Sequence, residues 1–203
     1  MLCLGYMISP TACVLALWAA WLLGWLLAAA STAAVVFRQS LSSRLAHSVP
    51  IWVGAVFLFL QPHRFGILLH PLLPRSALMA WGGVVILALG LGFAVWARVH
   101  LGRLWSATVT LKVEHTLIRS GPYALTRHAI YTGLLMALVG TALVRATVAA
   151  LGGLLLFLVG FMLKIRQEER LLLERFGGAY RAYQQEVPAL VPRLRSRSSL
   201  TRA

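Results

Sequence analysis

The stretch IYTGLLMALVGTALV (Ile130–Val144) is followed, after only Arg145 and Ala146, by a second apolar stretch, TVAALGGLLLFLVGFMLKI (Thr147–Ile165). A helix rises about 1.5 Å per residue, so a run of about 20 apolar residues crosses the roughly 30 Å of hydrocarbon in a bilayer. Two apolar runs joined by two residues therefore predict a tight hairpin of membrane-spanning helices. Small residues allow close helix contact in lipid, and glycines recur through both runs, at Gly133, Gly140, Gly152, Gly153 and Gly160.

Three further apolar runs precede this hairpin, at Thr11–Phe37, Pro50–Leu60 and Ala77–Val99. The second run is short and is extended past Pro62 by residues 65–69, so we expect a broken or tilted span there. Of the 203 residues, 60% are hydrophobic and 12% are charged, whereas about 25% are charged in a soluble domain. We therefore predict an all-α, polytopic helical membrane protein with about five transmembrane helices and no separate soluble domain.

The nineteen Lys and Arg residues are unevenly distributed between the predicted spans. The first and third loops, on one predicted side, carry two and five of these residues. The second and fourth loops, on the other side, carry two and one, and the tail from Lys164 onward carries nine. Basic residues favour the cytoplasmic side, so this division predicts an N-terminus outside and a cytoplasmic C-terminus, in a bacterial inner membrane. Topology and attraction to anionic lipids account for the net charge of +14, and we expect membrane lipids, not nucleic acid, as partners.

The chain beyond the last span is expected to leave the membrane as a cytoplasmic helix. This helix runs to about Ala182, with an interruption at Gly177-Gly178. Val187-Pro188 and Val191-Pro192 then end it, because proline lacks the N–H that a helix requires. The last eleven residues are rich in Ser and Arg, and we expect a disordered basic tail.

A first polar segment on the predicted cytoplasmic side has side chains suited to chemistry. Residues Ser120–Tyr123 form a turn signal, and Arg127, His128 and Tyr131 follow at the start of a span. The free N–H groups at the start of a helix favour binding of an anion. His128 and Tyr131 are three residues apart and therefore share a helix face. The alternative is an interfacial belt in which these side chains lie at headgroup depth.

A second polar segment contains Glu168 and Glu169, two of only five acidic residues in the chain. Carboxylates near a lipid interface are costly without partners. They can bind a cationic ligand, or Glu168 can form an ion pair with Lys164 four residues earlier on a solvated helix. Other candidate partners are basic residues of the same side, namely Arg127, Arg166 and Arg170.

Several other kinds of site are not expected. The six histidines are scattered and have no cysteine partner, so we predict no metal site. Gly152-Gly153 lies inside a span and cannot form a phosphate-binding loop. The chain contains no Asp, which excludes a Ser-His-Asp triad.

Taken together, the two polar segments resemble the isoprenylcysteine carboxyl methyltransferase family and its bacterial relatives. The resemblance covers about Trp105 to Pro192, where six elements have the order and spacing of the family, and the first two spans carry no such motif. One departure is Ala129, where the family has proline. The matching elements read His115-Thr116-Leu117, Ser120-Gly121-Pro122-Tyr123, Arg127-His128-Ala129-Ile130-Tyr131-Thr132-Gly133, Glu168-Glu169, Phe176-Gly177-Gly178-Ala179-Tyr180-Arg181-Ala182-Tyr183 and Val187-Pro188.

The resemblance implies an integral membrane methyltransferase that uses S-adenosyl-L-methionine and acts on a lipophilic or lipid-anchored acceptor. It also divides the chain into N-terminal transmembrane helices (1–75), a methyltransferase-like membrane core with the cofactor loop (76–192) and the basic tail (193–203). Carried over position by position, the implied cofactor contacts are His115, Thr116, Leu117, Ile118, Tyr123, His128, Ala129, Ile130, Tyr131 and Glu168.

The implied catalytic residues depend on the acceptor. Lys164 stands where the family has a basic residue near the acceptor, and a carboxylate acceptor needs only a cation such as Lys164 or Arg127 to orient it. An amine acceptor needs a base, for which Glu169 or a histidine is available. A prenylated cysteine, a phospholipid amine and a small lipophilic acid all remain open, with carboxylate O-methylation favoured.

Two other functions are compatible with these residues. One is a membrane reductase of similar helical arrangement that uses NADPH, which would need several cations around the phosphates of its cofactor. The other is a non-enzymatic lipid-binding protein in which the basic tail binds the membrane.

Overall fold

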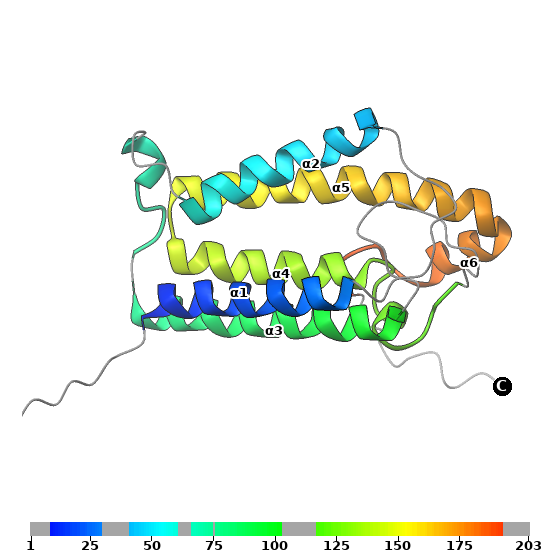
Figure 1. The fold of residues 1–203 in the computed structure, drawn as a ribbon, viewed down its shortest axis with the longest axis horizontal. Helices are drawn as coiled ribbons and strands as arrows, with labels where there is room; N and C mark the ends of the chain where they lie inside the picture. The colour runs from blue at the N-terminus through cyan, green and yellow to red at the C-terminus, as the bar shows by residue number, and fades with distance from the viewer. Residues whose placement is uncertain (1–8, 30–40, 61–65, 75, 103–116, 193–203) are drawn as a thin grey trace, which may run out of the picture.

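The computed structural model describes residues 9–29, 41–60, 66–74, 76–102 and 117–192. Five long helices lie side by side along an elongated bundle, and a shorter helix, α6, lies at one end (Figure 1). The α-helices are α1 (Pro10–Ala29), α2 (Leu41–Ala55), α3 (Ala77–Leu101), α4 (Ala129–Arg145), α5 (Val148–Phe176) and α6 (Gly178–Glu186). Three short helical segments are η1 (Val56–Leu60), η2 (Gly66–Leu69) and η4 (Gly121–Ala124).

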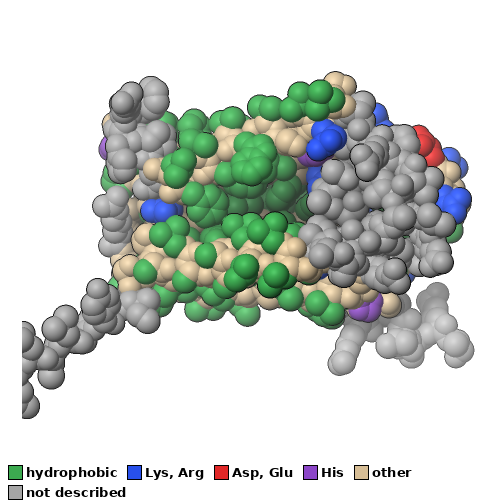
Figure 2. Space-filling view, viewed as in Figure 1, with side chains coloured by type: hydrophobic (Ala, Val, Ile, Leu, Met, Phe, Trp, Pro, Cys, Tyr) green, Lys and Arg blue, Asp and Glu red, His purple; other side chains and the backbone are tan. Residues whose placement is uncertain are grey.

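Helix length and hydropathy confirm an all-α membrane protein. Four helical segments in the described part are long and apolar enough to cross a membrane: Pro10–Ala28, Leu41–Leu60, Ala77–Leu101 and Val148–Phe176. The fifth long helix, α4, is apolar but has only 17 residues. Hydrophobic side chains cover the sides of the bundle, while Lys and Arg gather toward the end that carries α6 (Figure 2).

The predicted hairpin is confirmed. Helix α4 ends at Arg145 and α5 begins at Val148. Ala146 turns the chain with a φ of 50°, and the Thr147 hydroxyl accepts a hydrogen bond from the N–H of Ala150 at 3.2 Å. This Thr147 contact is an N-cap, which satisfies one of the free N–H groups at the helix start.

The second span was placed wrongly at its N-terminal boundary. The sequence predicted a start at Pro50, but α2 begins at Leu41 and contains Pro50. The first two turns are polar in sequence, yet His47 is buried against α5, so tertiary contact adds to the stability of these turns. Gly66–Leu69 form the short 3₁₀ segment η2, and the start of the predicted extension lies outside the described residues, because residues 61–65 are not described.

The glycines of the two hairpin helices pack against other helices of the bundle and not against each other. A Cβ on Gly140 would lie 2.4 Å from the carbonyl oxygen of Gly83 on α3, and one on Gly133 would lie 2.6 Å from that of Gly90. On α5, a Cβ on Gly153 would lie 2.7 Å from the carbonyl oxygen of Gly54 on α2. The bundle therefore consists of two close pairs, α3 with α4 and α2 with α5, because only glycine admits such backbone approach.

Aromatic side chains fill the space between the two pairs. Phe157 and Phe161 of α5 belong to a buried cluster with Leu58 and Leu138, against which Trp18 of α1 packs. The Trp18 indole also donates to the hydroxyl of Thr141 on α4 at 2.9 Å. These contacts bring α1, α4 and α5 together, so that α4 and α5 present a common polar end beyond the apolar core.

Candidate active site

The candidate site lies at the end of the bundle that carries α6, and we call this the site end. Its walls come from η4, the start of α4, the C-terminal part of α5, and α6 (Figure 1). The turn predicted around Gly121-Pro122 is present, with Gly121 at a φ of 57°, a value that favours glycine. It brings Arg127 and His128 directly before the first turn of α4, opposite the two glutamates of α5.

Arg127 and Glu169 form a largely buried ion pair. The side chains are 10% and 19% exposed, and Arg127 Nη2 lies 2.8 Å from Glu169 Oε1. Arg127 Nε also donates to the same oxygen at 3.1 Å. The remaining Arg127 nitrogen, Nη1, donates to the backbone carbonyls of Gln184 and Val187. Each guanidinium nitrogen thus has an acceptor, which a buried charge requires.

His128 connects the two glutamates. Its Nε2 donates to Glu169 Oε1 at 3.1 Å, and its Nδ1 lies 3.6 Å from Glu168 Oε2. Burial opposes the charged imidazolium, but the hydrogen bonds and charges of Glu168 and Glu169 outweigh burial and raise the pKa of His128 above its ordinary value. A protonated His128 can satisfy both carboxylates at once, because both ring nitrogens are then donors.

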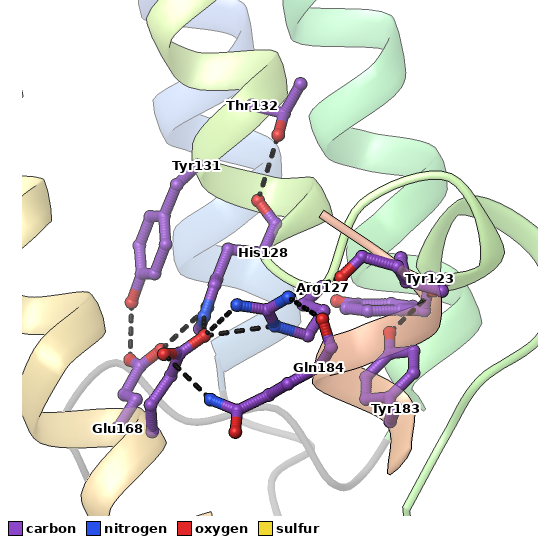
Figure 3. Close-up of polar contacts among 10 residues, drawn as sticks. Tyr123, Arg127, His128, Tyr131, Thr132, Glu168, Tyr183 and Gln184 are labelled. Carbon is purple, nitrogen blue, oxygen red and sulfur yellow. Dashed lines mark hydrogen bonds and ion pairs between the residues drawn. The ribbon is translucent and has the colours of Figure 1, made fainter. Parts of the chain in front are cut away.

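Glu168 has a different environment from Glu169. The Tyr131 hydroxyl donates to Glu168 Oε1 at 2.5 Å, and the Glu168 side chain is 23% exposed. Figure 3 shows Tyr131 and His128 approaching Glu168 from α4, while Arg127 and Gln184 lie on the side of the second glutamate. Arg127 therefore pairs with Glu169, whereas Glu168 accepts from the Tyr131 phenol and shares the His128 ring with Glu169.

Lys164 lies near Tyr131, one helical turn before Glu168. Its Nζ is 5.5 Å from the centroid of the Tyr131 ring, a cation–π distance. Tyr131 also stacks with His128 at 5.9 Å and contacts Phe161 at 5.2 Å between ring centroids. The phenol thus connects the polar network to the aromatic core between the helix pairs.

The chain after α6 crosses the start of α4. The N–H groups of Arg127 and His128 donate to the carbonyls of Pro188 and Ala189 at 2.9 and 3.0 Å, and the Thr132 hydroxyl donates to the carbonyl of Leu190 at 2.7 Å. We call residues 187–190 the C-terminal strap. The predicted free N–H groups at this helix start are therefore partly occupied by the strap.

Two tyrosines hold η4 to α6. The Tyr183 hydroxyl donates to the carbonyl of Tyr123 at 2.5 Å, and the Tyr123 hydroxyl donates to the carbonyl of Ala97 at 3.4 Å. Burial raises the pKa of Tyr183 to about 12, and burial also raises the pKa of Tyr123. Both phenols therefore stay protonated and act as donors at neutral pH.

Residues 83–174 match the family model of the isoprenylcysteine carboxyl methyltransferase (ICMT) family. A probable protein-S-isoprenylcysteine O-methyltransferase of Oryza sativa subsp. indica is 31% identical over 144 residues, which cover 70% of this chain and 75% of that protein. The chain belongs to the ICMT family.

Two further proteins are similar to this family member. The cobalt-zinc-cadmium resistance protein CzcN of Cupriavidus metallidurans is 32% identical over 145 residues, 67% of each chain. The solved structure of the eukaryotic intramembrane Ras methyltransferase ICMT superposes with a TM-score of 0.52 at 25% identity. The match covers 77% of this chain and 54% of that one, so this chain spans about half of the solved protein.

Six of the thirteen residues implied by the family resemblance lie together at the site end. Lys164, Arg127, Glu169, His128 and Tyr131 lie in or beside the network around Glu168. Other implied residues face the core: Tyr123 and Ala129 are buried together with Ala97, and Ile118 and Ile130 pack against them. Leu117 is half-buried, while His115 and Thr116 lie outside the described residues.

Three contacts of this ICMT-family site were not anticipated from sequence. Gln184 Nε2 donates to Glu169 Oε2 at 3.2 Å, Thr132 binds the C-terminal strap, and Glu186 pairs with Arg119. Gln184 and Glu186 lie between the motif residues Tyr183 and Val187, and no sequence motif points to them. Among the described residues, no group of His, Cys or Glu has the arrangement of a metal site.

Proposed function

We propose that this protein transfers the methyl group of S-adenosyl-L-methionine to the carboxylate of a lipophilic acceptor in the membrane. The observation that carries the proposal is the inequality of the two glutamates. Glu169 is paired with Arg127 at 2.8 Å, while Glu168 is 23% exposed, accepts a phenol hydrogen bond and has the His128 ring at the longer distance of 3.6 Å. A carboxylate in that position retains negative charge for a cationic ligand.

The described residues fit this cofactor. Its sulfonium and ammonium groups call for an anion, which Glu168 supplies. The N–H groups of the first turn of α4 precede the first intrahelical bond, from Thr132 N–H to the His128 carbonyl, and suit a carboxylate. His115 and Thr116 remain predicted cofactor contacts.

Methyl transfer is an in-line displacement in which the S–CH₃ bond breaks as the O–CH₃ bond forms. A carboxylate acceptor loses no proton, so the residues of the protein have to align the reactants and match their charges. Lys164 suits the acceptor carboxylate, because its ammonium lies over the ring of Tyr131, one helical turn before Glu168. In this assignment the cation binds the acceptor and the anion binds the cofactor.

We propose a different role for Arg127 and Glu169 from the one the sequence suggested. The guanidinium nitrogens of Arg127 donate to Glu169 and to two backbone carbonyls, one in α6 and one in the strap. Glu169 also binds His128 and Gln184. We assign both as positioning residues that hold His128 and the strap against α4. This assignment replaces an acceptor cation at Arg127 and a base at Glu169.

The site end is assigned to the cytoplasmic face, which is where the cofactor is available and where the positive-inside rule places it. The acceptor then enters from the lipid, and prenylcysteine, the group named for the Oryza relative, is the first candidate. Its thioether-linked isoprenoid is apolar and its carboxylate is at the headgroup level, which matches an apolar bundle with Lys164 at its polar end.

The test is binding of S-adenosylhomocysteine to the purified protein in detergent. Glu168→Gln removes the charge and should weaken binding about 10- to 100-fold, as expected for loss of a hydrogen bond to a charged group. Glu174→Gln, on the same helix but exposed, is the matched control and should bind like the wild type. NADPH serves as the competing ligand, since a reductase would be stabilised by NADPH instead.

Two results would reject the proposal. One is absence of wild-type binding at millimolar S-adenosylhomocysteine. The other is an unchanged affinity in Glu168→Gln when its melting temperature shows that the protein is folded.

A further inference from the structure

An arginine without a described counter-ion lies at the end of the bundle opposite α6, where α4 turns into α5 (Figure 1). Arg145 is the last residue of α4 and is half-buried. In the described part of the chain its guanidinium makes one hydrogen bond, from Nη2 to the Phe59 carbonyl at 3.3 Å, and its Nε is buried without an acceptor. The described glutamates belong to the site network, to the last turn of α5 and to α6. A charged side chain next to lipid calls for an anionic partner.

The length of α4 places Arg145 at the depth of lipid headgroups. The helix has 17 residues and rises about 1.5 Å per residue, so Arg145 lies about 25 Å along the axis from the polar network at the helix start. The hydrocarbon layer of a bilayer is about 30 Å thick. Since the site end is assigned to one membrane face, the guanidinium lies close to the opposite boundary of the hydrocarbon, where lipid phosphates are within reach of a long side chain.

An apolar cavity of about 150 Å³ adjoins this arginine. Ala142, one turn before Arg145, and Ala146, directly after it, line the cavity together with leucines of α4, α5 and the chain after η2. Ala142 and Leu154 of the cavity wall also pack against the same buried cluster as Phe59, whose carbonyl binds Arg145. A cation and an apolar cavity are therefore adjacent at this end of the bundle.

Backbone hydrogen bonds hold the wall of this cavity in place. The Leu72 N–H donates to the Ala146 carbonyl at 2.9 Å, and the Val148 N–H donates to the His70 carbonyl at 3.1 Å. Leu72 and Leu151, which both line the cavity, are exposed on the surface of the bundle. An apolar cavity of this size stays dry and accepts apolar groups, and the surface leucines connect it to the surrounding acyl chains.

We propose that this end of the bundle binds one anionic phospholipid, with the phosphate on Arg145 and part of an acyl chain in the cavity. A guanidinium has five N–H donors, of which one reaches the Phe59 carbonyl, and its planar fork suits the oxygens of a phosphate. A free phosphate matches only the cation, and an uncharged lipid matches only the cavity. An anionic phospholipid matches both, and its binding here does not depend on the proposed methyl transfer.

The test adds phosphatidylglycerol, or phosphatidylcholine with the same acyl chains, to delipidated protein in a neutral detergent. Native mass spectrometry and the melting temperature report binding. Arg145→Met should weaken binding of the tightest phosphatidylglycerol about tenfold, the effect of one lost hydrogen bond to a charged group, and leave phosphatidylcholine binding unchanged. Arg44→Ala removes an exposed cation of α2 and should bind like the wild type. A melting temperature that Arg145→Met lowers equally in both lipids would reduce Arg145 to a structural contact and overturn the inference.

A second pair of variants tests the cavity without touching the charge. Val139→Phe puts a ring into the cavity from its α4 wall and should weaken phosphatidylglycerol binding by a similar factor. Leu89→Phe adds the same ring to the exposed surface of α3, outside the cavity, and should have no effect. If Val139→Phe binds the lipid like the wild type, the acyl chain does not enter the cavity and the inference is wrong.

Three other occupants would each overturn the inference by a distinct result. Inorganic phosphate that raises the melting temperature as much as the lipid would indicate a free anion. Displacement of phosphatidylglycerol by N-acetyl-S-farnesylcysteine would assign the cavity to the acceptor, and a dimer that Arg145→Met dissociates would assign it to a second copy of the chain. Arg145→Met should bind S-adenosylhomocysteine within about twofold of the wild type, because the two sites are at opposite ends of the bundle. Failure of cofactor binding in the wild type therefore rejects only the proposed function.

Discussion

The same two helices, α4 and α5, are held together by different means at the two ends of the bundle. At the end formed by Ala146 and Thr147, which we call the hairpin end, the chain itself connects them. Backbone bonds from Leu72 to Ala146 and from Val148 to His70 add to this connection, at 2.9 and 3.1 Å. Beside them is an apolar cavity of about 150 Å³. At the site end, Arg127 and the two glutamates connect the helices through side chains.

The difference shows where polar interactions are needed in a membrane bundle. A two-residue turn keeps the two helices adjacent without any buried charged side chain. The hairpin end can therefore be apolar. At the site end the helices are far from their connection along the chain, and charges there hold them while also forming a ligand site. Polar groups near lipid are costly, so their concentration at one end indicates function as well as stability.

The largest effect should come from removing the charge that holds the site end. Arg127→Met leaves Glu169 without its cation and the carbonyls of Gln184 and Val187 without a donor, which should destabilise the protein by about 3–5 kcal/mol. The measurement is thermal or denaturant unfolding in detergent. The matched variant at the hairpin end is Arg145→Met, which loses one 3.3 Å bond to the Phe59 carbonyl and should cost about 1 kcal/mol. Equal losses would contradict the comparison.

A smaller effect should come from pH, and only at the site end. The pKa of His128 is raised in the folded protein by Glu168 and Glu169, against the opposing effect of burial. The stability that protonated His128 contributes is therefore complete below its unfolded pKa of about 6.5 and is lost as pH rises through the higher folded value. Melting temperatures of the wild type and His128→Gln should converge as pH increases from 6 toward 9. A difference that is constant with pH would show that His128 is neutral.

The smallest effect is expected at the hairpin end and has the opposite sign. Ala146 has a φ of 50°, a left-handed conformation that costs an L-residue roughly 1–2 kcal/mol and glycine almost nothing. Ala146→Gly should therefore leave stability unchanged or raise it by up to about 1 kcal/mol. Unfolding in detergent measures this directly, with binding of S-adenosylhomocysteine as the check that the site end is unaffected. A loss above about 1 kcal/mol would mean that the buried Ala146 methyl matters more than the turn.

Much of the architecture was predictable because lipid imposes simple rules on a spanning chain. The hairpin, the span at Ala77–Val99, the turn at Gly121-Pro122 and the interruption at Gly177 all follow from hydropathy or from the conformations of glycine and proline. The start of α2 did not follow, because the first two turns of this helix are polar and their contacts with α5 arise only in the folded bundle. Arg127 was correctly included among the candidate partners of the glutamates, but its full set of acceptors was not apparent.

The amino-acid sequence by itself determined that this chain spans a membrane as helices, that its polar residues gather in two segments, and that those segments have the motifs of the ICMT family. Hydropathy and residue spacing act along the chain, so they can be read without coordinates. Only the tertiary structure decided which helices pair and which glutamate binds Arg127. These features depend on distances between residues far apart in sequence, and helices that are apolar on every side do not specify which face meets which neighbour.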